Sequence, residues 1–259
     1  MAQTAPSARE TRDDDERLSR LSANARANQW HADDAIDWNR GPRLPFWVSK
    51  EKARRAVSQL YHGEIATSGM CRSLLNAIDD EIVRDCLGYQ LADELRHASV
   101  YARYLDGIGG IAPMDPNLER ALSESQDGPL QPVSTILAFH IIVEGEVLRQ
   151  QEMLARLLPC PLLRQINRLV ARDEARHVAF GKIYLKSVLA DQSSDKRAEL
   201  YAWLHRIWSQ ATAFAANDRS RRNALERAAL TWLRGGWRHH DIALRRIGVR
   251  PRDAWTAAT

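Results

Sequence analysis

Cysteine is scarce in this chain of 259 residues, and its placement argues against two kinds of protein. The three cysteines, Cys71, Cys86 and Cys160, are far apart, and none belongs to a C-x-x-C pair. This spacing speaks against a disulfide framework and against a thiolate metal site. We expect reduced thiols and, with them, a cytoplasmic location.

Long hydrophobic runs are also lacking. The longest apolar stretch covers residues 136–143, is interrupted by His140 and is too short to cross a bilayer. Residues 13–16 are all acidic and no apolar segment surrounds them, so we expect neither a secretory signal nor a membrane partner. The length is sufficient to bury a sizeable core, as an α-helical enzyme requires.

Two five-residue segments repeat each other 80 positions apart. Asp-Glu-Leu-Arg-His at 93–97 returns as Asp-Glu-Ala-Arg-His at 173–177, and a further glutamate precedes the Glu of each copy by 30 residues. In an α-helix, the Glu and the His of one copy lie within about 60° of each other on one face. Such a doubled set of carboxylates and imidazoles is the ligand inventory of a dinuclear metal site in a four-helix bundle. The candidate ligands are Glu64, Glu94, His97, Glu144, Glu174 and His177.

The spacing of 30 residues predicts two helical hairpins. The midpoint of the first pair is near Asp79, among polar residues that can cap a helix. The midpoint of the second pair falls in Pro159-Cys160-Pro161, which breaks a helix. Fifteen residues of helix span roughly 22 Å, so both hairpins bring their carboxylates to one level.

Glu144 and Glu146 compete for the second upstream position. They point about 200° apart on a helix, so only one can face the core. Apolar residues share the face of Glu144, and Glu144 alone reproduces the spacing. We therefore predict Glu144 as the ligand and Glu146 as a solvated group or one that supports the ligands.

Three regions follow along the chain. Residues 1–48 comprise a polar tail, expected to be disordered or frayed to about residue 27, and an arm rich in Trp and Pro. Residues 49–190 hold the four ligand-bearing helices, with a Gly/Pro-rich crossover at 106–132. Residues 191–259 form a basic helical extension, with two helices expected within 195–247.

The repeated Asp-Glu-x-Arg-His pattern with its upstream glutamates resembles the ferritin-like superfamily of non-haem di-iron proteins. Its members include the small subunit of ribonucleotide reductase, multicomponent hydroxylases, acyl-carrier-protein desaturases and rubrerythrins. The resemblance covers about residues 50–190 and implies an all-α, ferritin-like four-helix bundle with a long crossover, here with an N-terminal arm and extra C-terminal helices. The implied roles are bridging carboxylates for Glu94 and Glu174, imidazole ligands for His97 and His177, and terminal carboxylates for Glu64 and Glu144.

The same resemblance assigns the remaining residues of the two motifs. Asp93 and Asp173 would each hold the ligand histidine of the opposite half and fix its tautomer. Arg96 and Arg176 would neutralise these buried aspartates.

The ligand types indicate the chemistry. A site rich in oxygen ligands with two imidazoles favours iron, with manganese allowed in one position, over zinc or copper. Two such ions can reduce O2 as a co-substrate and oxidise a small organic substrate by hydroxylation, N-oxygenation, desaturation or C–C cleavage. An electron donor such as ferredoxin or a reductase is then needed, and a homodimer is common in the superfamily.

Four further residues are candidates near the site. Tyr101 lies one turn after His97, at the offset of a radical tyrosine in the ribonucleotide reductase small subunit, although a buried structural tyrosine is favoured over a radical one because Tyr is a normal core residue. His140, Thr67 and Ser68 are candidates for lining the substrate pocket, and a core histidine is the alternative for His140.

One departure separates the chain from a subfamily. Arylamine N-oxygenases of this superfamily add a third ligand histidine one turn before the second-motif glutamate, and this chain has Val170 there. Val170 therefore argues against that subfamily.

The C-terminal region supplies the alternative classes. Ten arginines and only two acidic residues, Glu226 and Asp241, lie between Arg219 and Arg252, and the formal net charge of the chain is +4. A tRNA-modifying di-iron hydroxylase would use such a basic face to bind nucleic acid, but no nucleic-acid recognition motif accompanies it. A solvated face, or a docking surface for an acidic partner such as ferredoxin or a carrier protein, is therefore favoured over nucleic acid. His239 and His240 are expected to be exposed. A non-catalytic iron-handling or radical-bearing protein is a further alternative, which a cage-like oligomer with an oxide core would reveal.

Overall fold

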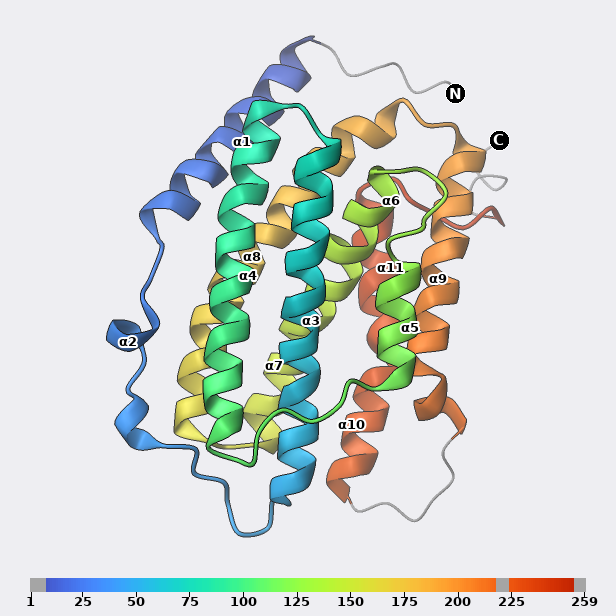
Figure 1. Ribbon diagram of the computed structural model, residues 1–259. Coiled ribbons are helices and arrows are strands. Elements are labelled where there is room, and N and C mark those ends of the chain that lie inside the picture. Colours follow the sequence, from blue (N-terminus) through green and yellow to red (C-terminus); the bar gives the residue numbers. More distant parts are fainter. Residues whose placement is uncertain (1–7, 218–223, 254–259) are drawn as a thin grey trace. The chain divides into compact units, whose positions relative to one another are not determined.

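The computed structural model describes residues 8–217 and 224–253, which are mostly helical and contain no strand (Figure 1). Its elements are α1 (Ala8–Ala27), α2 (Ala32–Ala35), η1 (Trp38–Arg40), α3 (Lys50–Ala77), α4 (Glu81–Asp106), α5 (Pro116–Glu124), α6 (Val133–Ile136), η2 (Leu137–Val143), α7 (Glu144–Leu157), α8 (Pro161–Ala190), α9 (Ser194–Asn217), α10 (Ala224–Arg234) and α11 (Gly236–Arg246).

The chain forms two compact units that are assembled from separate segments. The bundle unit contains Arg20–Asp115 and Glu146–His177. The second unit contains the described residues of Met1–Ser19, Pro116–Gly145 and Val178–Thr259. Because each unit combines distant parts of the sequence, the division into three regions along the chain stays a prediction.

Four helices dominate the bundle unit, as the repeat predicted. The long helices α3 and α4 lie side by side (Figure 1), and residues 146–157 of α7 and 161–177 of α8 complete the set. One apolar cluster joins all four helices and the arm. Its buried members include Trp30 and Ile36 from the arm, Val57 and Leu60 from α3, Val100 and Leu105 from α4, Leu154 from α7, and Leu162, Ile166 and Val170 from α8.

Both predicted hairpin turns are present. Helix α3 ends at Ala77, and α4 begins after Asp80, whose side chain accepts a hydrogen bond from the backbone N–H of Val83 at 2.9 Å. Helix α7 ends at Leu157 and α8 begins at Pro161, because proline fits the first turn of a helix but not its interior.

The second unit is built on contacts between α5 and α9 and between α11 and the segment η2. Arg206 donates to Glu124 at 2.9 Å and ties α9 to α5. The segment η2 is π-helical and leads directly into Glu144, the first residue of α7. Such wider turns often occur next to functional sites, because they shift the direction of the side chains that follow.

The N-terminal expectation is corrected by helix α1. Residues 8–27 are helical and not frayed, whereas residues 1–7 lie outside the described part. Leu18, Ser22 and Ala25 are buried at the helical spacing of four and three, so one narrow stripe of small and apolar side chains suffices to order a very polar helix.

In the described part of the C-terminal region, the helices α9, α10 and α11 lie where two helices were expected. Gly235 separates α10 from α11, since a glycine lowers the cost of leaving the helix. Arg219, Arg221 and Arg222 lie outside the described residues. His239 is exposed as expected, but His240 is fully buried and packs against Trp208 with ring centroids 4.7 Å apart.

The sequence indicated neither a membrane-spanning helix nor a disulfide framework. No helix in residues 8–217 and 224–253 combines the length and apolar character that crossing a membrane requires. All three cysteines are buried, and none of them forms a disulfide.

The cap of α4 gives a direct test of the first hairpin. Asp80→Ala removes the acceptor for the Val83 N–H and should lower the free energy of unfolding by about 1 kcal/mol. Asp79→Ala, one residue away and exposed, is the matched control and should change it by less than about 0.5 kcal/mol. Urea unfolding of both variants makes the comparison; equal losses would contradict the capping role.

Candidate metal centre

Five of the six candidate ligands lie in the bundle unit and are buried there. Glu64 comes from α3, Glu94 and His97 from α4, and Glu174 and His177 from α8. Glu64, Glu94, His97 and Glu174 each offer one ligand atom within 4.8 Å of the others. The two halves of the repeat thus bring their carboxylates to one place.

Both imidazoles turn the same nitrogen toward the carboxylates. The Nδ1 atom of His97 lies 3.3 Å from Glu174 Oε1 and 3.5 Å from Glu94 Oε2. The Nδ1 atom of His177 lies 3.1 Å from Glu94 Oε1 and 3.4 Å from Glu174 Oε2. Glu94 and Glu174 are therefore shared by both histidines. Glu64 is placed on the His97 side, with Oε2 3.5 Å from Nδ1.

The opposite nitrogen of each ring is held by an aspartate of the other half. His97 Nε2 lies 3.2 Å from Asp173 Oδ2, and His177 Nε2 lies 3.1 Å from Asp93 Oδ2. A carboxylate at this position favours a proton on Nε2 and leaves Nδ1 as the coordinating atom. The crossed pairing expected from the resemblance is present.

Two arginines neutralise the aspartates. Arg96 donates to Asp93 and, at 3.0 Å, to Asp173. Arg176 donates to Asp173 and to Asp93, at 2.8 Å in each case. Each arginine thus bridges the two halves, as buried carboxylates require.

The arm adds two partners that sequence reasoning missed. Trp30 Nε1 donates to Asp173 Oδ2 at 2.7 Å, and its ring lies 4.6 Å from the guanidinium carbon of Arg96. Gln29 donates to Asp93 at 2.9 Å and accepts from Arg96 at 2.7 Å. The aromatic content of the arm indicated anchoring but not the polar target, because the indole N–H finds its acceptor only in the folded chain.

The charges of the cluster depend strongly on one another. Burial alone would lower the pKa of His97 and of His177, but the surrounding carboxylates outweigh it and hold each pKa well above 6.5. Burial would raise the pKa of Glu94, but the two histidines hold it well below 4.5. Burial and the charge of Glu174 raise the pKa of Glu64 well above 4.5.

The buried carboxylates and imidazoles of the cluster are suited to binding metal cations. Several buried atoms of four residues approach one another without the geometry of a hydrogen bond: Glu64 Oε1, Glu94 Oε2, His97 Nδ1, and both Glu174 oxygens. Burying such atoms without a partner costs several kcal/mol per ionised group (on the order of 3–5) unless a cation compensates them. Oxygen atoms with few imidazoles suit iron or manganese.

Glu144, the sixth candidate, begins α7 in the second unit, one residue before the end of that unit's segment. It is 1% exposed, and its role as a ligand remains a prediction. Glu146 was expected to be solvated or to support the ligands; it is 7% exposed and accepts a hydrogen bond from Arg149 at 3.1 Å. Because Glu146 is buried, the solvated alternative is wrong, and its role in supporting the ligands stays a prediction.

The remaining candidates are distributed over both units. In the bundle unit, Tyr101, Thr67 and Ser68 are buried, and the hydroxyls of Thr67 and Ser68 donate to backbone carbonyls of their own helix. In the second unit, His140 is buried in η2, donates from Nδ1 to the Ile136 carbonyl at 3.2 Å and packs on Phe180. Their roles in a substrate pocket stay predictions.

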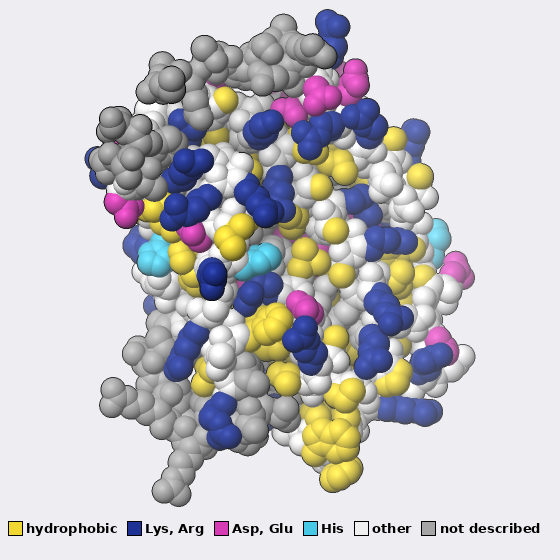
Figure 2. Space-filling model, turned by 180° about the vertical axis from the view of Figure 1, so that it is seen from behind, with side chains coloured by type: hydrophobic (Ala, Val, Ile, Leu, Met, Phe, Trp, Pro, Cys, Tyr) yellow, Lys and Arg dark blue, Asp and Glu magenta, His cyan; other side chains and the backbone are white. Residues whose placement is uncertain are grey.

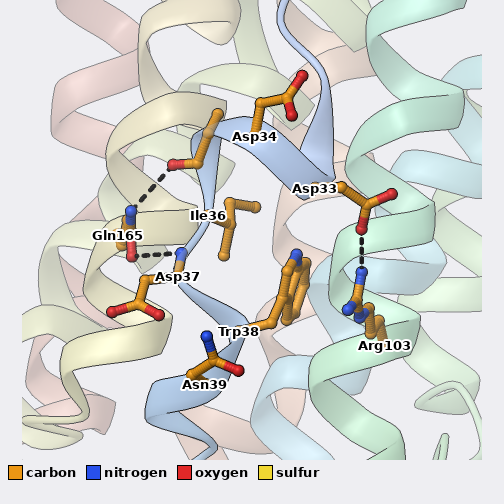
Figure 3. A pocket seen from close by; sticks show the side chains of 9 residues that line it. Asp33, Asp34, Ile36, Asp37, Trp38, Asn39, Arg103 and Gln165 are labelled. Carbon is orange, nitrogen blue, oxygen red and sulfur yellow. Dashed lines mark hydrogen bonds and ion pairs between the residues drawn. The ribbon is translucent and has the colours of Figure 1, made fainter.

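A surface pocket of about 440 Å³ lies elsewhere in the bundle unit (Figure 3). Trp38 lines it together with three exposed aspartates, of which Asp33 pairs with Arg103 at 2.6 Å and Asp37 with Arg40 at 2.9 Å. Because all three carboxylates are exposed to water and two are neutralised by arginines, this pocket does not compete with the buried cluster as a metal site.

The indole hydrogen bond can be tested in the metal-free protein. Trp30→Phe keeps the ring but leaves Asp173 without one of its donors, so the free energy of unfolding should fall by about 1–3 kcal/mol. Trp38→Phe is the matched control, because its indole donates only to the Ala32 carbonyl in a half-buried position and its loss should cost less. Urea unfolding measures both, and a larger loss for Trp38→Phe would contradict the role of Trp30.

The raised pKa values of His97 and His177 give a pH dependence for the metal-free protein. The stabilisation from their protonated forms is complete below their unfolded pKa of about 6.5 and is lost as pH rises through the higher folded values. The free energy of unfolding should therefore decrease as pH rises above about 6.5. His177→Gln should flatten this dependence in urea titrations, and an unchanged slope in that variant would contradict the prediction.

Comparisons with solved structures support the fold. The chain superimposes on a substituted R2-like ligand-binding oxidase with an anaerobically reconstituted Mn/Fe cofactor at a TM-score of 0.70 and 17% identity, over 89% of this chain and 93% of that one. An R2-like ligand-binding oxidase with an aerobically reconstituted Mn/Fe cofactor gives 0.68 and 20%, over 91% and 94%. These likenesses confirm the expected ferritin-like helical fold. No curated protein matches the chain.

The family described as p-aminobenzoate N-oxygenase AurF matches residues 67–229, more than half of the chain. This match overturns the argument that Val170 speaks against the arylamine N-oxygenases. Val170 is fully buried in the apolar cluster of the bundle unit, so an apolar side chain takes this place without removing the other ligands. The chain belongs to the p-aminobenzoate N-oxygenase AurF family, and it is an O2-dependent di-iron enzyme of the oxygenase and oxidase class.

Proposed function

We propose that the enzyme uses O2 to oxygenate the nitrogen of a small aromatic amine. The observation that carries this proposal is the pair of imidazoles that turn Nδ1 toward the shared carboxylates Glu94 and Glu174 while aspartates fix Nε2. The name of the family supplies the reaction type. We assign six residues to the metals: Glu64, Glu94, His97, Glu144, Glu174 and His177.

The contacts of the glutamates with the two histidines support separate roles as bridging and terminal ligands. Glu94 and Glu174 each approach both histidines, so we assign them as bridging carboxylates. Glu64 approaches His97 and is its terminal partner. Glu144 takes the equivalent role beside His177 because the repeat places it 30 residues before Glu174. When bound, two iron ions, or one iron and one manganese, supply the electrons and the binding site for O2.

The protein prepares this site by orientation, charge and exclusion of water. Asp93 and Asp173 keep the proton on Nε2 of each histidine, so that Nδ1 is available to a metal. Arg96 and Arg176 balance the aspartates and leave the charge of the glutamates for the metals. The ligands are buried, which keeps water away from the reacting centre.

Oxygenation of one substrate molecule by O2 needs two further electrons, because the second oxygen atom leaves as water. We propose that a ferredoxin or a reductase supplies them. Lys and Arg side chains outnumber Asp and Glu on the face shown in Figure 2, which favours an acidic donor protein. The finer expectations, a carrier protein that presents the substrate and a homodimer, remain proposals.

The proposed function predicts a product that contains one oxygen atom from O2. The metal-free protein would be loaded with ferrous iron without oxygen and then mixed with ¹⁸O2, a reductant and a panel of aromatic amines that includes p-aminobenzoate. Mass spectrometry should show the incorporation of label at nitrogen. Glu94→Ala removes a bridging ligand and should lower bound iron and product at least about 100-fold.

Glu152→Ala is the matched control, because Glu152 is an exposed residue of α7 that pairs only with Arg156 among the contacts described. Its iron content and product yield should equal those of the unchanged protein. If the iron is fully oxidised but no amine of the panel gains ¹⁸O at nitrogen, N-oxygenation is contradicted and another oxidation is favoured. Full iron binding by Glu94→Ala would contradict the assignment of the ligands.

A further inference from the structure

An oxidisable side chain lies next to the proposed metal centre. Tyr101 follows His97 by one helical turn and is fully buried. Burial and the charge of Glu64 raise the pKa of its phenol well above 10, and the charges of His97 and Glu174 also act on it. A phenol this close to an oxygen-activating site competes with the substrate for oxidation.

Two amides hold the hydroxyl of Tyr101. It donates a hydrogen bond to Asn167 Oδ1 at 3.1 Å and accepts one from Gln151 Nε2 at 3.1 Å. Among the described residues, it has no hydrogen bond to a carboxylate or an imidazole. The carboxylates of the cluster are therefore not in position to take its proton directly.

The amides are built into the same helices as the ligands. Asn167 precedes Glu174 by seven residues on α8, and Gln151 lies on α7. Seven residues are about two turns, so Asn167 shares a face with Glu174. Both amides are buried, and the apolar cluster that contains Tyr101 also contains Leu154, Ile166 and Val170 from these two helices. Two amides at this depth are costly to bury and need a reason beyond packing.

Oxidation of a tyrosine moves a proton as well as an electron. The electron passes to the oxidised metal centre and reduces it by one equivalent, while the phenolic O–H bond breaks and its proton must be accepted by a neighbouring base. A carboxylate or an imidazole accepts a proton readily, whereas an amide oxygen is an extremely weak base. Exchanging the oxygen and nitrogen of either amide would not change this conclusion, because neither atom is a useful base.

We propose that Asn167 and Gln151 keep Tyr101 in its reduced form, so that the oxidising equivalents of the metal centre reach the bound substrate. The inference rests on the proposed function, since it requires a centre that O2 oxidises. Asn167 and Gln151 are positioning residues, and they act by denying Tyr101 a proton acceptor. Tyr101 is then a buried phenol that is not oxidised in the reaction cycle, in place of the radical candidate suggested by its spacing from His97.

The test installs the missing base. Asn167→Asp and Gln151→Glu are nearly isosteric and place a carboxylate beside the phenol. Asn167→Leu is the matched control, since it removes the same hydrogen bond without supplying a base. The unchanged protein and these variants would be loaded with ferrous iron, mixed with O2 without substrate, and frozen rapidly for EPR and Mössbauer spectroscopy at about pH 6 and about pH 9, so that a buried carboxyl group is sampled on both sides of its titration.

Iron should be oxidised in all of these proteins. A tyrosyl radical should appear in Asn167→Asp or Gln151→Glu at a yield at least about tenfold above that of the unchanged protein and of Asn167→Leu. It should disappear when Tyr101→Phe is added to the carboxylate variant. A purely structural role of the amides predicts instead that Asn167→Leu and Asn167→Asp behave alike.

The outcomes separate this inference from the proposed function. Iron oxidation together with a Tyr101 radical in the unchanged protein would overturn the inference alone. So would iron oxidation with no radical in either carboxylate variant at both pH values. Failure of the unchanged protein to oxidise iron with O2 would overturn the proposed function, and the inference with it.

Discussion

The crossed contacts between each histidine and the aspartate of the other half are the constraint on which the structure depends. They fix His97 to Asp173 and His177 to Asp93, so α4 and α8 can meet in only one register. A shift of either helix by one residue would rotate a buried charge by about 100° and leave it unpaired. The arginines of both motifs then bridge the two aspartates, which makes each half of the repeat incomplete without the other.

The surrounding chain is organised to support these buried charges. The arm contributes an indole N–H to Asp173 and an amide to Asp93, through residues far from both motifs in sequence. The apolar cluster that holds Trp30 and Ile36 also packs against all four bundle helices, so the arm is anchored by hydrophobic contact where it donates its hydrogen bonds. In the bundle unit, the apolar packing of the arm therefore holds in place the residues that donate hydrogen bonds to the two buried aspartates.

The chemistry of an oxygen-activating enzyme requires that its own side chains survive. The carboxylates of the glutamates are hard to oxidise, but Tyr101 is an oxidisable phenol one turn after His97. Its two amide partners satisfy its hydrogen-bonding needs without offering a base. Gln151 on α7 and Asn167 on α8 thus serve the proposed function because their amide groups cannot accept a proton from the phenol.

The sequence alone determined the two hairpins and the shared face of each Glu and His pair, because local periodicity and an internal repeat encode them directly. The crossed aspartates were expected only from the resemblance to the ferritin-like superfamily. Helical spacing fixes which face Glu94 and His97 share, and proline fixes where α7 ends. Tertiary structure decided the rest. Glu146 was expected to be solvated or to support the ligands, and the packing of the folded chain buries it, which helical spacing along α7 could not show. The partners of Trp30 and Tyr101 belong to helices far away in sequence, and a hydrogen bond across such a distance depends on the packed geometry and not on any local pattern.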